Sequence, residues 1–415
     1  MGQHNGNADS RKTIAAKDAS TVALVARQPI FDATMNVAGY ELLYRTPGAA
    51  RALVEDPARA TAQVMVNAAL DIGLTRLAAD QPVYINFPQQ LLTPQLQLPL
   101  HPERVVIEVL EGCAPVEELL LTLGRLREQG YRVALDDFHI QRESGLLLQH
   151  ADIVKVDVRE HSPPELVKSL DALRRHPVRL VAEKIETGAE LDRCRNLGFD
   201  LFQGYFLRQP EIVQTRRVPG DQQAAVELVA RLNDPGVSAD SIEQCIRRDM
   251  GLGCRLLRCI DSRHLRTPHQ VSSMRQAIQL LGTAELRKLG WLLLAAGIAG
   301  QPGQFCVQSL QRARMCELLC EQARIGGSEA AFIAGMLSML DVFLGLPMEQ
   351  ALASLPLGDA VRAALLRREG DLGAALSCAE QYERGTRQGL RLRELTIDEI
   401  AGCHRRAVEW ANSRE

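Results

Sequence analysis

Two adjacent carboxylates at the end of an apolar stretch are the first residues here that could do chemistry. Val133-Ala-Leu precedes Asp136 and Asp137, and Phe138 follows them. If the stretch is a buried strand, it leaves the core and presents both acids at its C-terminal end. Neighbouring carboxylates repel each other and are costly to bury unpaired, and a shared divalent cation is the simplest relief. For an isolated pair, two solvated acids in a turn are the more ordinary interpretation, so the other strands decide.

Other apolar stretches carry polar residues in the same way. These residues are Glu41, Asn86, Glu108, Lys155, Glu183 and Gln203. One polar residue in an apolar strand is often a buried residue whose hydrogen bonds are satisfied in the core. A series of strands that each carry such a residue is hard to explain in this way. The set is rich in oxygen and lacks His and Cys, which suits hard cations such as Mg²⁺ or Mn²⁺. Two such ions could share Asp136 and activate a water for in-line attack on a phosphate.

Strands and helices must alternate to place these residues together. Strand patterns occur at 22–26, 36–45, 83–87, 105–111, 133–138, 153–157, 180–186 and 201–206. Helical patterns lie between them at 59–77, 116–129, from 163 onward and at 189–196. The first two strands are close enough to be antiparallel. The sequence therefore predicts an α/β fold, a modified TIM-like (β/α)8 barrel with an irregular start and its site at the C-terminal ends of the strands.

Length and composition restrict the class of protein. The 415 residues exceed one ordinary domain, and 46% hydrophobic with 24% charged residues is typical of a soluble globular protein. A net charge of −3 gives no general case for nucleic-acid binding. The ten cysteines are scattered and indicate reduced thiols. Neither a secretory signal nor a membrane-spanning run is apparent, so we expect a cytoplasmic protein without membrane contact.

The second half of the chain has a different pattern. From Gln222 onward only helical periodicity is present, and the segment 380–415 is strongly charged. We predict a disordered tail at 1–20, the barrel at 21–212, and an all-α domain with a C-terminal helical tail at 213–415. No His is followed by Asp anywhere in the chain, which argues against an HD-type hydrolase. The helical half is therefore interpreted as a regulatory or protein-interaction module.

The ordered motifs of the first half resemble the EAL family of cyclic di-GMP phosphodiesterases. They are Gln28-Pro29-Ile30, Glu41-Leu42-Leu43-Tyr44-Arg45, Asn86, Glu108 with Glu111, Asp136-Asp137-Phe138, Lys155 with Asp157, Glu183 with Glu186, and Gln203-Gly204-Tyr205. Each motif is weak by itself, and their order along the chain makes the set specific. The resemblance implies hydrolysis of cyclic di-GMP to linear pGpG with a two-metal site holding Mg²⁺ or Mn²⁺.

The resemblance also implies a role for each matching residue. It assigns metal binding to Glu41, Asn86, Glu108, Asp136 and Asp137. Glu183, as base or metal-shell group, and Lys155, at the nucleophilic water, would be catalytic. Substrate contacts would come from Gln28, Leu43, Arg45 and Gln203. Glu111 and Glu186 would support the loop after Asp137.

Three departures from the EAL pattern bear on activity. Leu42 stands where the family has Ala, and Lys184 stands where it has Gly. The loop after the Asp pair begins with His139 and has lost the Gly-Thr-Gly-Tyr-Ser-Ser-Leu pattern of active members. The metal-binding residues argue for turnover and the loop argues against it, because a slightly misplaced site can be far slower.

The helical half resembles the HDOD domain, an inert relative of HD-type phosphohydrolases. Four segments carry the likeness: 232–235, 248–258, 272–282 and 335–341. The order of the two domains resembles the YuxH-type bacterial signalling proteins. Two functions stay open: a phosphodiesterase regulated by the helical domain, and an inactive cyclic di-GMP receptor or scaffold. The implied partners are cyclic di-GMP and a signalling protein bound through the HDOD domain, and a homodimer is also compatible.

Overall fold

The chain divides into two compact units. The computed structural model describes residues 22–46, 54, 56–96, 98–139, 145–234, 236–261, 270–296, 304–353, 355–386 and 390–412. One unit is Leu24–Gln214, and the other includes Thr215–Glu415. The tail predicted at 1–20 lies outside the described residues.

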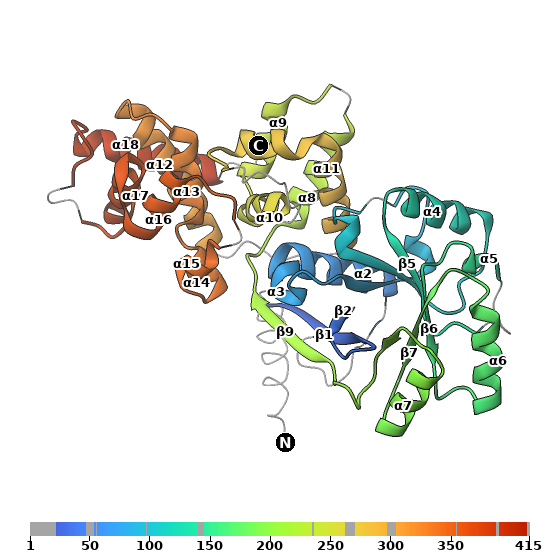
Figure 1. The fold of residues 1–415 in the computed structure, drawn as a ribbon. Coiled ribbons are helices and arrows are strands. Elements are labelled where there is room, and N and C mark those ends of the chain that lie inside the picture. The colour runs from blue at the N-terminus through green and yellow to red at the C-terminus, as the bar shows by residue number, and fades with distance from the viewer. Residues whose placement is uncertain are drawn as a thin grey trace, which may run out of the picture. The chain divides into compact units, whose positions relative to one another are not determined.

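The first unit is a closed barrel, which confirms the predicted fold class (Figure 1). The sheet runs in the order β2-β3-β4-β5-β6-β7-β8-β1, and β1 also pairs with β2, which closes the ring. β1 is antiparallel to both β2 and β8, whereas the pairs from β2 to β8 are parallel. The strands are β1 Val22–Asp32, β2 Val37–Leu43, β3 Val83–Phe87, β4 Val105–Val109, β5 Arg132–Leu135, β6 Ile153–Asp157, β7 Arg179–Glu183 and β8 Leu201–Phe202.

Three strands differ clearly from the sequence prediction. β1 continues to Asp32, beyond the predicted end at residue 26. The last barrel strand, β8, is only two residues long, where a strand over 201–206 was expected. A further strand, β9 (Glu211–Arg216), was not predicted, and it pairs with β1 at the edge of the sheet (Figure 1). None of its residues is buried. Without a buried face, the strand has no strong apolar alternation to reveal it.

Helices cover the outside of the barrel (Figure 1). The predicted helix at 59–77 is three segments. The α-helical α2 continues directly into the π-helical η1, and Gly73 at φ 95° separates η1 from α3. Capping boxes at Ser162 and Thr187 start two others. The helical segments are α2 Pro57–Val66, η1 Asn67–Ile72, α3 Leu74–Ala78, η2 Gln89–Leu91, η3 Pro102–Arg104, α4 Glu117–Glu128, α5 Gly145–Leu148, α6 Pro163–Leu173 and α7 Gly188–Asn196.

Side chains from successive strands form one apolar cluster in the barrel, here called the apolar layer. Its members are Ile30, Tyr84, Val106, Ala134, Ile153, Val181 and Leu201, all buried. β2 contributes Gly39 opposite Ile30, where a Cβ would come within 2.6 Å of the Tyr84 ring. Because strand side chains alternate in direction, the residue two positions further along each parallel strand lies on the same side. The apolar layer is therefore a floor for the residues that follow it.

The second unit consists of helices, as predicted. Gly282 at φ 76° interrupts α11. Trp410 packs edge-on against Phe332, with ring centroids 5.9 Å apart. The helices are α8 Gln222–Asn233, α9 Ala239–Arg247, α10 Met250–Asp261, α11 Met274–Ala296, α12 Gln304–Gln322, α13 Ser328–Leu337, α14 Leu340–Leu344, α15 Met348–Ala351, α16 Asp359–Arg367, α17 Gly370–Glu383 and α18 Ile397–Asn412. Within the described residues, no helix is both long and apolar enough to cross a membrane.

The close approach of two backbones after β7 and β8 gives a testable prediction. A Cβ on Gly204 would overlap the backbone nitrogen and oxygen of Ile185. We expect Gly204→Ala to destabilise the barrel by ~1–3 kcal/mol, as overpacking of a core does. Calorimetry should show a barrel transition at lower temperature. Tryptophan fluorescence provides an internal control, since both tryptophans, Trp291 and Trp410, lie in the helical unit.

A helical glycine provides the matched variant. Gly124 on α4 has only the His150 ring, at 3.7 Å, near its added Cβ. Gly124→Ala should leave the transition in place or raise it, because Ala is the better helix former by ~1 kcal/mol. Equal transitions for the two variants would contradict the assigned backbone contact at Gly204.

Candidate active site

Each barrel strand supplies one polar side chain to a common level, here called the polar layer. On β3, β4, β6 and β7 this residue lies two positions beyond a member of the apolar layer, within the strand. On β5 and β8 it is the first residue after the strand ends. On β1 and β2 the residues are Gln28 and Glu41, which lie directly opposite each other in the strand pair. The layer consists of Gln28, Glu41, Asn86, Glu108, Asp136, Lys155, Glu183 and Gln203.

The ammonium group of Lys155 lies at the centre of the polar layer. Its Nζ is 2.8 Å from an oxygen of Asp136, Glu108 and Glu183, and 3.5 Å from Glu41 Oε2. The Lys155 side chain is 1% exposed. An ammonium has three N–H groups, which matches the three nearest carboxylates. Although burial opposes it, these carboxylates, Asp136 foremost, raise the pKa of Lys155 well above its ordinary value.

Two amides orient the carboxylate of Glu41. Asn86 Nδ2 donates to Glu41 Oε1 at 3.1 Å, and Gln203 Nε2 donates to Glu41 Oε2 at 2.7 Å. The backbone of Asn86 is fixed in turn, because the hydroxyl of Thr61 on α2 donates a hydrogen bond to the backbone carbonyl of Asn86. Glu41 therefore receives hydrogen bonds from β3 and from the residue after β8.

Three buried oxygen atoms of this layer lack a hydrogen-bond partner among the described residues. They are Asn86 Oδ1, Gln203 Oε1 and Glu108 Oε2. Glu108 is wholly buried, and burial raises its pKa well above the ordinary value. Burial likewise raises the pKa of Glu183 to about 8. Unpartnered buried oxygens carry a desolvation penalty that a bound cation would relieve.

The donor set fits a hard divalent cation, with one structural condition. Carboxylate and amide oxygens are the ligands that such cations take. Among the described residues, no three acidic, His or Cys side chains form a ready-made metal cage. The Lys155 ammonium accounts for this, because it occupies the centre toward which the carboxylates point. Glu41, Asn86, Glu108 and Asp136 would hold the cation in competition with that ammonium.

Asp137 lies apart from this cluster. Its carboxylate receives Lys184 Nζ, at 2.9 Å from Oδ2 and 3.2 Å from Oδ1. The same Nζ is 2.8 Å from Asp157 Oδ2. Although burial opposes it, hydrogen bonds to Asp157 and Asp137 raise the pKa of Lys184 above its ordinary value. In the sequence Lys184 stands out only as a departure from the EAL pattern, and no local signal predicts this ion pair.

A cavity of about 300 Å³ opens above the polar layer. Among its lining residues are the predicted Gln28, Glu41, Leu43, Asp136, Asp137, Lys155, Glu183, Glu186 and Gln203. Arg159 and Tyr205 also line it, and the sequence reading assigned no role to either. Tyr205 is 61% exposed, which places an aromatic ring at the rim. Tyr205 belongs to the motif Gln203-Gly204-Tyr205 and Arg159 to none, and the folded structure places both at the cavity.

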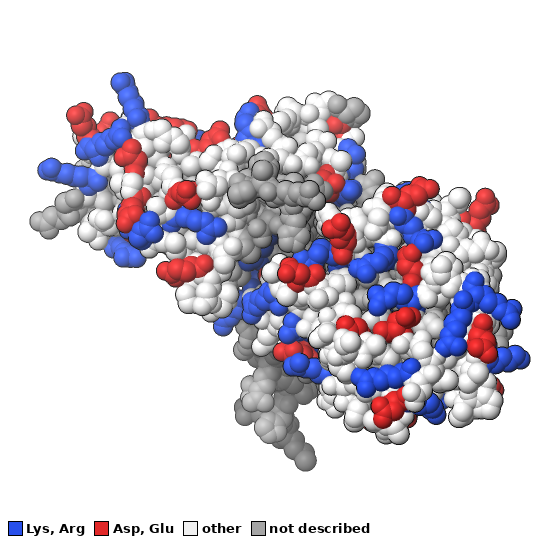
Figure 2. Space-filling view, viewed as in Figure 1, with Lys and Arg blue, Asp and Glu red and all other residues white. Residues whose placement is uncertain are grey.

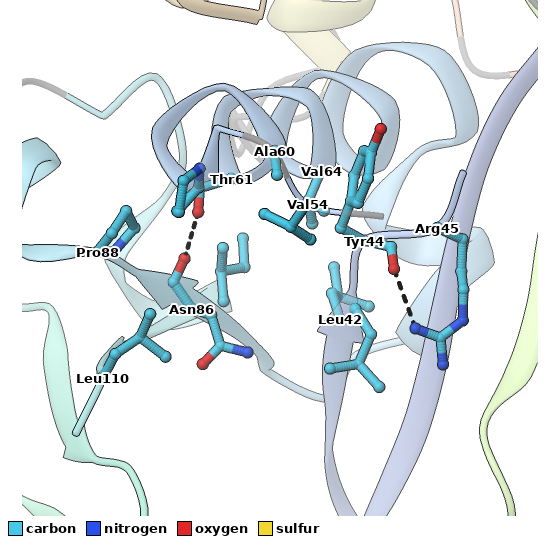
Figure 3. Close-up of a pocket in the computed structure, with 13 residues that line it drawn as sticks. Leu42, Tyr44, Arg45, Val54, Ala60, Thr61, Val64, Asn86, Pro88 and Leu110 are labelled. Atoms are coloured by element: carbon cyan, nitrogen blue, oxygen red, sulfur yellow. Dashed lines mark hydrogen bonds between the residues drawn. The ribbon is translucent and has the colours of Figure 1, made fainter. Parts of the chain in front are cut away.

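Arg45 and Leu43 border a second cavity, of about 270 Å³ and largely apolar (Figure 3). Leu43 lines both cavities. In Figure 3 the Arg45 guanidinium turns back to the carbonyl of Tyr44, to which Nη1 donates at 3.0 Å. Arg45 does not line the cavity above the polar layer. The structure thus places Arg45 beside the neighbouring cavity, and its substrate contact stays a prediction.

The two predicted loop-support residues lie outside the polar layer. Glu111 is exposed in the turn after β4. The Glu186 carboxylate pairs with Arg159, while the Glu186 N–H donates to Glu190 at 2.8 Å. The altered loop itself, 140–144, lies outside the described residues, so its support stays a prediction. At its start, His139 Nε2 is 2.7 Å from Glu160 Oε2.

Two protein families match different parts of the chain. The model of the EAL domain family matches residues 23–210, and that of the HDOD domain family matches residues 218–352. Among solved structures, the EAL-containing YkuI protein of Bacillus subtilis, in complex with c-di-GMP and calcium, is similar at a TM-score of 0.40 and 22% identity. That similarity covers 48% of this chain and 58% of the other.

Two relatives match nearly the whole chain. Cyclic di-GMP phosphodiesterase CdgJ of Vibrio cholerae is 35% identical over 383 residues, which are 90% of this chain and 88% of CdgJ. The uncharacterized protein YuxH of Bacillus subtilis is 30% identical over 400 residues, which are 94% of this chain and 98% of YuxH. These matches confirm both resemblances found in the sequence. The chain belongs to the family of proteins that join an EAL domain to an HDOD domain.

Proposed function

We propose that the barrel is a cyclic di-GMP phosphodiesterase that depends on a divalent cation, Mg²⁺ or Mn²⁺, and releases linear pGpG. The observation that carries this proposal is the polar layer, in which three buried carboxyl groups and the half-buried Asp136 face one another at the mouth of the barrel. Such a concentration of acid is unfavourable unless it serves to bind positive charge. The similarity to CdgJ over nearly the whole chain supports this substrate.

Each residue of the layer has a task in this proposal. A divalent cation at Glu41, Asn86, Glu108 and Asp136 would supply Lewis-acid activation of water and screen phosphate charge. Glu183 lines the cavity and would accept the proton of the attacking water at its carboxylate. Lys155 would orient that water and balance the charge of the carboxylates. Gln203 would keep Glu41 in place through its 2.7 Å hydrogen bond.

The substrate would occupy the cavity above the polar layer. Leu43 and Tyr205 would offer apolar and aromatic contact to the bases, and Gln28 and Gln203 would offer amide groups. On the face shown in Figure 2, basic and acidic side chains are interspersed over the surface. A mixed surface favours a small nucleotide in a cavity over a long nucleic acid on a basic stripe.

A receptor that binds cyclic di-GMP without turnover is the second candidate. The ion pair of Lys184 with Asp137 favours it, because it engages a carboxylate that the two-metal scheme assigns to metal. In either case we propose that the HDOD domain relays the signal to a partner protein. A homodimer of the chain is compatible with both.

Replacing Glu41 tests the phosphodiesterase proposal. The purified chain with Mg²⁺ or Mn²⁺ should convert cyclic di-GMP to pGpG, followed by chromatography. Mutation of residues that only hydrogen-bond to metal ligands typically costs roughly 10- to 100-fold in activity. Glu41→Gln changes a proposed ligand itself, so it should reduce the rate by more than this. Glu117→Gln, an exposed carboxylate on α4, serves as the control and should be as active as wild type. Tight calorimetric binding without turnover in wild type would favour the receptor instead.

Replacing Lys155 tests whether its ammonium balances the carboxylates. In EDTA, Lys155→Met should destabilise the barrel by ~3–5 kcal/mol, because removing one partner leaves buried charges uncompensated. Saturating Mn²⁺ should recover much of this loss, since a ligand of the folded state stabilises it. Lys168→Met on the exposed face of α6 is the matched control. A Lys155→Met barrel as stable as wild type in EDTA would contradict this role.

A further inference from the structure

Lys184 is a second lysine at the mouth of the barrel, and the chemistry proposed above does not use it. Its Nζ lies 2.9 Å from Asp137 Oδ2 and 2.8 Å from Asp157 Oδ2. The other oxygen of Asp137 is 3.2 Å away. The other oxygen of Asp157 accepts the N–H of Arg159 at 2.9 Å. The ammonium is therefore held between two carboxylates, both committed to this arrangement.

The positions of these residues place the ammonium directly above the polar layer. Lys184 follows Glu183 in the chain, and Asp137 follows Asp136. Asp157 lies two residues beyond Lys155 on β6, so it points to the same side of the sheet. Asp157 is 6% exposed, and Lys184 lines the cavity. A positive charge here faces whatever occupies the cavity.

The backbone shows that this arrangement is held against a conformational preference. Lys184 has φ 57° and Asp137 has φ 43°, both in the left-handed region. That region disfavours residues with a Cβ, and glycine adopts it freely. Strained residues persist where surrounding contacts over-determine them. Here the contacts include the ion pairs of Lys184. The neighbouring backbone is also fixed, because Phe138 N donates to Lys155 O and Ile185 N donates to Gln203 O.

We propose that the Lys184 ammonium takes the place of a second divalent cation. The barrel then binds one such ion, at Glu41, Asn86, Glu108 and Asp136, and Lys184 is the fixed positive charge at Asp137 and Asp157. This inference rests on the proposed function, because it assumes that the polar layer binds a divalent cation.

Electrostatics explains why the lysine excludes a second ion. A divalent cation on Asp137 would lie close to an ammonium that contacts the same carboxylate, and like charges repel strongly at that range. A lysine ammonium is a compact point charge on a flexible stem, so it can approach both acids at once. The ammonium neutralises the carboxylates as a metal ion would, but it has no coordination position at which it could bind and activate water. Lys184 would thus contribute charge and leave water activation to the single metal.

Counting bound metal tests the inference without an activity readout. The full chain, stripped with EDTA and re-equilibrated with Mn²⁺, should hold one tightly bound ion by elemental analysis, with the paramagnetic resonance signal of isolated Mn²⁺. Lys184→Gly suits the backbone and frees both acids, so it should hold two ions with a spin-coupled signal. Lys184→Gln keeps the stem without the charge, and it should also hold two ions. It replaces the glycine variant as the test if that variant does not fold.

Further variants locate the second ion. Lys184→Gly combined with Asp137→Asn should return to one ion, because the freed carboxylate is lost. Lys184→Arg keeps the charge and should stay at one. Arg159→Ala is the matched control, since it removes a neighbouring cation that lines the same cavity, and it should also stay at one.

The outcomes separate this inference from the function on which it rests. Two ions in wild type that still hydrolyses cyclic di-GMP would overturn the inference alone. If Lys184→Gly and Lys184→Gln both fold and each still binds a single ion, this inference is wrong, and the proposed function is unaffected. Absence of bound Mn²⁺ and of hydrolysis in wild type would overturn the proposed function and this inference together.

Discussion

The gathering of four carboxyl groups, three of them buried, around one ammonium is the interaction on which the barrel depends. Glu108 and Lys155 are almost completely excluded from water, and Glu41 and Glu183 nearly so. Burying such charges is unfavourable unless each is paired and hydrogen-bonded. The strand register meets this requirement by bringing eight side chains from eight strands to one level. The apolar layer beneath keeps water out from below, and Gly39 makes room in it for the ring of Tyr84.

The mouth of the barrel carries a second, more exposed group of charges with a different character. Lys184, Asp137 and Asp157 are joined across three neighbouring strand ends, above the polar layer. The inner cluster places one ammonium among four carboxyl groups and has unpartnered oxygens, whereas the outer group holds one ammonium between two acids. Each group thus contains a single positive charge and an excess of acids. Lys155 thus pairs with the carboxyl groups inside the barrel, and Lys184 pairs with those at its entrance.

The helical unit uses its charges internally. Arg312 on α12 lies 3.0 Å from Glu383 on α17, and Arg247 stacks on the Phe332 ring at 3.9 Å. The buried Asp249 accepts N–H groups from Asp221 and Leu252, although burial raises its pKa. These contacts join helices that are distant in sequence. In this unit, buried and partly buried charged residues therefore contribute to the packing of the helices.

The sequence by itself determined the class of both units and the residues of the polar layer. Strand alternation and strand-end polarity are local properties, so Glu108 or Lys155 can be recognised from a few neighbours. Only the tertiary structure decided which groups meet. It placed Lys155 at the centre of the acids, joined Asp137 to Lys184 from another strand, and turned Arg45 toward a neighbouring cavity. It also revealed β9, whose exposed residues lack a periodic signal. The physical reason is that an ion pair depends on distance in space between residues far apart in the chain, and closure of the barrel sets that distance.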